Sequence, residues 1–128
     1  MARHEQYPGP TEALDRYLAA IAELPDVERK GAKNPYTSRN GHMFSFLAAD
    51  GTLAIRFSAE RQQEFLATND SSVVEAYGRT MRGYVRVPDD LVADAASTAR
   101  LLAESHEWIG TLQPKSTTSR RTTGSART

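Results

Sequence analysis

The sequence predicts a two-layer α+β domain, in which helices cover an antiparallel sheet of about five strands. Two turn signals, Asn40-Gly41 and Asp50-Gly51, separate short segments of alternating polarity, as at the start of a strand meander. Segments with apolar residues at helical spacing lie before and after these strands. The length of 128 residues, with 39% hydrophobic and 25% charged residues, suits one globular domain.

The first predicted helix follows a short arm. Residues 1–10 contain two prolines and a glycine, and we expect them to form a flexible arm. Thr11 has the chemistry of an N-cap, and Pro25 is expected to end the helix. The inward-facing positions of this helix are Leu14, Tyr17, Leu18, Ile21 and Leu24.

Two hairpins are predicted next. Asn40-Gly41 indicates a type I′ turn, because both central residues of that turn need positive φ, and Asp50-Gly51 repeats the signal one strand later. Residues 27–39 form either a loop or a loop that leads into a strand over 36–39. We favour the strand, because a hairpin turn needs a strand on both sides. Simple alternation then places Phe44, Phe46 and Ala48 on one face, Met43, Ser45 and Leu47 on the other, and Leu53, Ile55 and Phe57 inward.

The second half of the chain is expected to add helices and two strands. The predicted elements are a helix over 59–66 capped by Ser58, strands over 73–77 and 81–87, one helical turn over 89–92, and a long helix over 95–112 capped by Asp94. Alternation places Met81, Val85 and Val87 on one face of the last strand and Arg82, Tyr84 and Arg86 on the other. The predicted shared core comprises Phe44, Phe46, Leu53, Ile55, Phe57, Leu18, Ile21, Leu101 and Trp108, with Trp108 docking the long helix.

Charge is unevenly distributed along this neutral chain. The last residues carry Lys115, Arg120, Arg121 and Arg127 and no acid, so the rest holds 12 of the 16 basic residues against all 16 acidic ones. We therefore expect a folded domain over 11–115, acidic in balance, and a disordered basic tail over 116–128. An acidic body is not typical of a dedicated DNA-binding domain.

No pattern of catalytic or metal-binding residues is present. The chain has no cysteine, and its histidines, His4, His42 and His106, lie at no metal-ligand spacing. Nucleophile-elbow, phosphate-loop and dinucleotide motifs are absent as well. We therefore predict a non-enzymatic protein with no catalytic residue, cofactor or metal site. The sequence has no apolar run that could span a bilayer and no secretory signal, so we expect a cytoplasmic protein without membrane partners.

Two basic groups are candidates for binding. One lies around the first turn and comprises Arg29, Lys30, Lys33 and Arg39; the other comprises Arg79, Arg82 and Arg86, interleaved with Tyr84. Arginine and tyrosine on one strand face can bind phosphate, stack on a base or bind a partner protein. They can equally form a solvated face whose long side chains cover apolar area. The hypothesis for a partner-binding site is Arg82, Tyr84 and Arg86.

Several of these segments together resemble a known family. They are Pro35, Asn40-Gly41-His42-Met43-Phe44, the strand through Asp50-Gly51, Gly78-Arg79-Thr80-Met81-Arg82-Gly83-Tyr84-Val85-Arg86-Val87-Pro88, and Leu112-Gln113-Pro114-Lys115. Over residues 11–115 the chain is similar to the N-terminal domain of the TfoX/Sxy family. It departs from the usual Met-Phe-Gly near the first strand, where Gly31, Ala32 and Lys33 stand. We also expect it to lack the second domain of full-length competence regulators.

The resemblance implies a function through protein contacts. Full-length members help the cyclic-AMP receptor protein to switch on DNA-uptake genes, and no catalytic residue is established for the family. We therefore expect a non-enzymatic domain that binds a protein partner in transcriptional regulation, as a monomer or homodimer. The alternatives are a nucleic-acid-binding protein that uses Arg82, Tyr84, Arg86 and the basic tail, with weak affinity, and a small-molecule-binding protein or enzyme with a pocket between sheet and helices.

Overall fold

The computed structural model describes residues 7–76 and 78–114, and the predicted basic tail over 116–128 lies outside them. It confirms the α+β class, with helices packed against a five-stranded antiparallel sheet. The elements are α2 (Thr11–Ile21), β1 (Tyr36–Arg39), β2 (His42–Leu47), β3 (Leu53–Arg56), α3 (Ala59–Thr68), β4 (Val73–Ala76), β5 (Arg79–Arg86), α4 (Asp89–Val92) and α5 (Ala95–Ile109).

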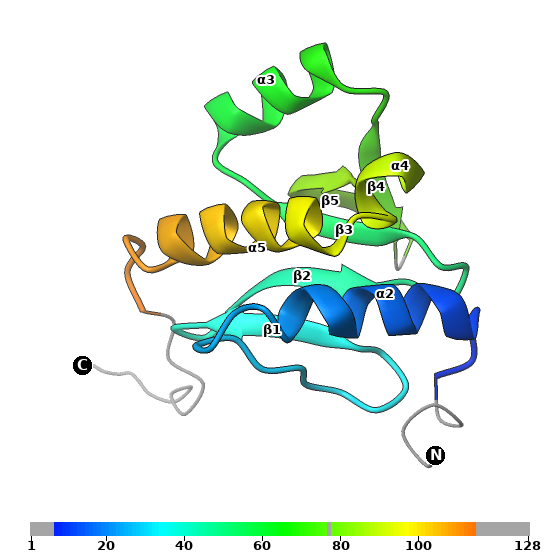
Figure 1. Ribbon diagram of the computed structural model, residues 1–128. Coiled ribbons are helices and arrows are strands. Elements are labelled where there is room, and N and C mark those ends of the chain that lie inside the picture. Colours follow the sequence, from blue (N-terminus) through cyan, green and yellow to red (C-terminus); the bar gives the residue numbers. More distant parts are fainter. Residues whose placement is uncertain (1–6, 77, 115–128) are drawn as a thin grey trace.

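The strands are ordered β1-β2-β3-β5-β4, and every neighbouring pair is antiparallel. The first three strands form a meander, after which the chain crosses through α3 to the edge strand β4 and returns as β5 beside β3. Helices α2 and α5 lie side by side on the same face of the sheet, whereas α3 lies beyond α5 and contacts β5 (Figure 1). The sheet therefore has one face that carries two helices and one face that does not.

The two hairpin turns differ in type. Asn40 and Gly41 have φ of 55° and 79°, as a type I′ turn requires. At the second turn only Gly51 has positive φ, at 93°, and the amide of Ala48 donates to the carbonyl of Thr52 at 2.8 Å. This is a three-residue loop with glycine in the left-handed position, so the expected repeat of the two-residue turn is wrong.

A β-bulge in β2 changes which face each side chain occupies. Thr37 pairs with Ser45 and Ser38 pairs with Met43, which leaves Phe44 as an extra residue. As a result Phe44 joins the core under the helices, whereas Phe46 lies in a separate cluster. The prediction that Phe44 and Phe46 share one face is wrong, because strict alternation assumes a strand without a bulge.

The main core lies between the sheet and the helices. From α5 the fully buried aliphatic side chains are Leu102 and Ile109, while Trp108 is only half-buried at the rim of the core. The other large side chains without exposed surface are Leu14, Tyr17, Phe44, Ile55 and Val85. The long helix is therefore anchored by its aliphatic residues rather than by the predicted tryptophan.

A chain of three hydroxyl groups crosses this core. Ser45 hydrogen-bonds both Tyr17 and Thr37, each at 2.5 Å between oxygens, and all three side chains are buried. Burial raises the pKa of Tyr17 strongly, and the hydrogen bonds from the two hydroxyl groups only partly oppose this shift. The three hydroxyl groups are buried, and each has a hydrogen-bond partner within the group. We therefore assign a role in fold stability to this group of hydroxyls.

The N-terminal boundary also differs from the prediction. Tyr7 is buried, and its hydroxyl donates to the carbonyl of Ala48 at 2.5 Å, so at least this part of the predicted flexible arm packs on the domain. Residues 1–6 lie outside the described residues. Pro10, not Thr11, occupies the N-cap position of α2, and the helix ends at Ile21, before Pro25. Within the described part of the chain, no helix has the length and apolar character needed to cross a bilayer.

Candidate functional site

The face of the sheet without α2 and α5 carries a second apolar cluster. Its buried members, Phe46, Ala54, Val74 and Tyr84, all come from strands. The rings of Phe46 and Tyr84 are 5.2 Å apart between centroids. Half-buried residues surround them, namely Tyr36, Met43, Ala48 and Met81. Because no described helical residue belongs to this cluster, we refer to this side as the helix-free face.

An irregularity in β5 builds part of this face. Val73 pairs with Val85 but Val74 pairs with Met81, so residues 82–84 of β5 have no partners in β4. Gly83 has φ of 85°, which a residue with a side chain adopts only with strain. Across this break Met81 and Tyr84 both pack in the second cluster, while Val85 lies in the main core. The prediction that Met81 and Val85 share a face is therefore wrong.

A hollow of about 390 Å³ lies at this end of the helix-free face. We call it the arginine hollow, and its lining residues are His42, Met43, Arg56, Arg79, Thr80, Met81, Arg82 and Tyr84. Three of the eight are arginines, and none of the described lining residues is an acid. Because guanidinium groups stay protonated at any physiological pH, the hollow has a fixed positive charge.

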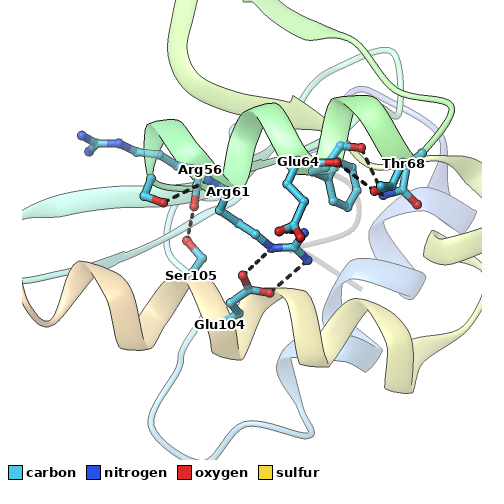
Figure 2. A network of polar contacts seen from close by, with 9 residues as sticks. Arg56, Arg61, Glu64, Thr68, Glu104 and Ser105 are labelled. Atoms are coloured by element: carbon cyan, nitrogen blue, oxygen red, sulfur yellow. Dashed lines mark hydrogen bonds and ion pairs between the residues drawn. The ribbon is translucent and has the colours of Figure 1, made fainter.

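Contacts on two sides hold Arg56 at this hollow. A Cβ atom on Gly83 would lie only 3.2 Å from Cγ of Arg56, so the missing side chain of Gly83 leaves the space that Arg56 fills. The guanidinium carbon of Arg56 lies 5.4 Å from the ring centroid of Trp108, within cation–π range. Figure 2 shows the Arg56 side chain extending away from the Arg61 and Glu104 pair. Glycine and tryptophan thus restrict the positions that this arginine can take.

Arg61 on α3 is in a very different environment. Its Nε and Nη2 groups donate to the two carboxylate oxygens of Glu104 on α5, at 2.6 and 3.3 Å, and Nη1 lies 3.1 Å from Glu64 (Figure 2). The hydrogen bond with Glu104 is the main reason why the pKa of Arg61 is raised. By contrast, Arg56, Arg79 and Arg82 form no ion pair and no side-chain hydrogen bond with any residue that the structure describes.

The structure brings together only part of the predicted binding site. Arg82 and Tyr84 both line the arginine hollow, but Tyr84 is buried, and its hydroxyl donates to the carbonyl of Met43 at 2.8 Å. Arg86 lines another hollow, near the start of α2, and donates to the carbonyl of Asp70 at 3.0 Å. Tyr84 is therefore held in place by the fold at the wall of the hollow, whereas Arg86 lines a different hollow.

Sequence reasoning missed Arg56. Its signal lies in the strand pairing, because Arg56 stands opposite Tyr84 in the β3–β5 ladder and directly opposed residues share a face. Once Ile55 is assigned to the core, alternation places the Cβ atom of its neighbour Arg56 on the other side of the sheet, although the guanidinium group at the end of the side chain lies over Trp108 of α5. Arg79, which the sequence grouped with Arg82 and Arg86 but which was not part of the predicted site, lines the hollow together with Arg82.

The basic residues around the first turn do not form one site. Lys30 donates to Ser38 at 2.7 Å, whereas Arg39 reaches across to α5 and donates to the carbonyl of His106 at 2.9 Å. The ring of His42 is 2.8 Å from the carbonyl of Gln113. No group of three or more potential metal ligands occurs among the described residues.

We compared the chain with protein-family models, curated proteins and solved structures, and found no match to any of them. The similarity to the TfoX/Sxy family therefore remains a prediction that rests on the sequence segments given above.

Proposed function

We propose that this chain is a non-enzymatic, TfoX-like domain that acts in the cytoplasm by binding a protein partner through the arginine hollow. The observation that carries this proposal is the contrast between paired and unpaired arginines. Two glutamates of the domain itself pair with Arg61, whereas three arginines converge on one hollow whose described lining residues include no acid. Arginine is among the residue types that dominate binding energy at protein interfaces. The role in transcriptional regulation is the part of the proposal that depends on the family resemblance.

The charge balance favours a protein partner over nucleic acid. Acidic residues outnumber basic ones in the chain before the C-terminal tail, so a long polyanion would be repelled outside the hollow. Nucleic-acid binding depends on many phosphate contacts along an extended basic surface. Three arginines at one hollow provide a local site for negative charge instead.

The test is an affinity capture from the native cell with two variants. The first variant, Arg79→Ala with Arg82→Ala, removes two charges from the hollow, and we expect it to lose a protein that the parent retains. The second, Arg16→Ala with Arg100→Ala, removes the same charge from α2 and α5 and should retain that protein. Equal recovery of every protein by parent and both variants would reject the proposal. A gel shift with duplex DNA and a salt series, run on the same variants, detects the nucleic-acid alternative.

A further inference from the structure

We infer that the arginine hollow accepts an acidic peptide segment, in which carboxylates bind the arginines and a neighbouring apolar side chain contacts the methionines. This inference deepens the proposed function and rests on it, since it specifies the chemistry of the partner. It starts from the lining of the hollow, in which Arg56, Arg79 and Arg82 are combined with Met43 and Met81.

The cationic part of the lining is suited to carboxylates. A guanidinium group presents a planar fork of donors that matches a carboxylate, and such bidentate bonds are about twice as strong as neutral hydrogen bonds. The domain uses this pairing itself where Arg61 meets Glu104. Since the hollow arginines have no carboxylate partner among the described residues, an incoming carboxylate displaces no internal ion pair.

The Arg56 side chain is held in place by its neighbours in the fold. Arg56 fills the space left by Gly83 and lies over Trp108, so its side chain is already restricted before a ligand arrives. An arginine whose position is already restricted loses less conformational entropy on binding than an unrestricted long side chain does. Arg79 and Arg82 are exposed, and they are free to adjust around a carboxylate that Arg56 has positioned.

The apolar part of the lining favours a peptide over a simple anion. Met43 and Met81 are half-buried, and methionine is unbranched and polarisable, so it adapts to side chains of different shape. A volume of about 390 Å³ is in the range of sites that hold compact ligands, so it suits a short segment rather than a folded domain. A segment that alternates acidic and apolar residues matches both parts of the lining.

The experiment measures binding of a labelled synthetic peptide of alternating Glu and Leu to the full chain by fluorescence anisotropy. A matched peptide with Gln in place of every Glu controls for the carboxylates. We expect the Glu peptide to bind in a salt-dependent manner, and the Gln peptide to bind at least about tenfold more weakly. The double variant Arg79→Ala with Arg82→Ala should lose about tenfold or more in affinity, whereas the control Arg16→Ala with Arg100→Ala should match the parent.

Three results would overturn the inference. The first is equal binding of the Glu and Gln peptides, and the second is an affinity that the hollow variant does not lower. The third is single-stranded DNA binding more tightly than the Glu peptide, with a loss in the hollow variant, which would assign the hollow to nucleic acid. The Glu peptide could fail to bind in the anisotropy experiment while the hollow variant still fails to capture a protein that the parent retains. In that case this inference is rejected and the proposed function stands. Circular dichroism of each variant confirms that it is folded.

Discussion

The two faces of the sheet use the same residue types for different purposes. On the helix-bearing face, aromatic and aliphatic side chains form one continuous core, and Arg61 is held by carboxylates from α3 and α5. On the helix-free face a small cluster is built around Phe46 and Tyr84, and the arginines beside it have no acidic partner among the described residues. Charged side chains are therefore paired with one another on one face, and on the other face we propose that they bind a ligand.

The largest expected effect comes from truncating the two phenylalanines of β2, which compares the main core with the second cluster. Phe44→Ala removes a fully buried ring from the main core and should lower the free energy of unfolding by about 3–5 kcal/mol. Phe46→Ala should cost less, about 3 kcal/mol or below, because half-buried neighbours can close around the vacated space. Urea denaturation of both variants checks the order. A larger loss for Phe46→Ala would mean that the two clusters do not differ as described.

The next effect concerns the glycine that makes room for Arg56. Gly83→Ala combines positive φ with a Cβ atom 3.2 Å from both Arg56 and the carbonyl of Phe57, and we expect a loss of about 2–3 kcal/mol. Gly78→Ala is the matched control, because Gly78 has φ of 78° but no described atom within 4 Å of the added Cβ. It should cost only the backbone strain, about 1–2 kcal/mol. Thermal unfolding that ranks the control as equal or worse would contradict the crowding at Arg56.

The ion pair between α3 and α5 should have a smaller effect. Both side chains are partly exposed, at 30% for Arg61 and 41% for Glu104, so solvent screens their attraction. Glu104→Gln should therefore lower stability by about 0.5–1 kcal/mol. A double-mutant cycle with Arg61→Gln measures the coupling between the two groups.

By comparison, Arg79→Ala with Arg82→Ala should change stability by less than about 0.5 kcal/mol. A stability loss in that variant as large as in Glu104→Gln would show that the hollow arginines also support the fold.

The smallest effect is a pH dependence from His106. Burial, and then the nearby guanidinium of Arg39, lower the pKa of His106 below its ordinary value of 6.5, while Asp26 and Glu107 oppose this shift. The unfolded chain therefore takes up a proton more readily than the folded one. The contribution of His106 is fully present above pH 6.5 and declines as the pH falls below it. In His106→Gln the stability should depend less on pH in this window, as denaturant titrations at several pH values can show. An unchanged slope would contradict the assigned shift.

The elements could be predicted from sequence because their signals are local. Alternation, turn glycines and helical spacing identified all five strands and the main helices, and Ser58 caps α3 as expected. Face assignment failed at two places, the bulge at Phe44 and the break at Gly83. Both depend on how a strand pairs with its neighbour, which alternation within one strand does not encode.

The candidate site was predictable only in part, for a related reason. Arg79 and Arg82 lie close together in the sequence and were grouped with Arg86, which lines a different hollow. Arg56 comes from another strand and joins Arg79 and Arg82 only through the β3–β5 register. Tyr84 was placed by alternation along one strand with Arg82 and Arg86, on the face opposite Met81 and Val85. Its burial follows from packing against Phe46, a contact between distant strands.

One measurement tests the central claim, that the helix-free face is the binding face, most directly. The methyl groups of methionine and isoleucine report the two faces separately. Met43 and Met81 line the arginine hollow, and the three isoleucines, Ile21, Ile55 and Ile109, all lie in the main core. The experiment titrates the Glu-Leu peptide into a chain with labelled methionine and isoleucine methyl groups and follows their NMR signals. The account predicts that the Met43 and Met81 signals shift to saturation while the isoleucine signals stay in place. Shifts confined to the isoleucine signals, with both methionine signals unchanged, would contradict it.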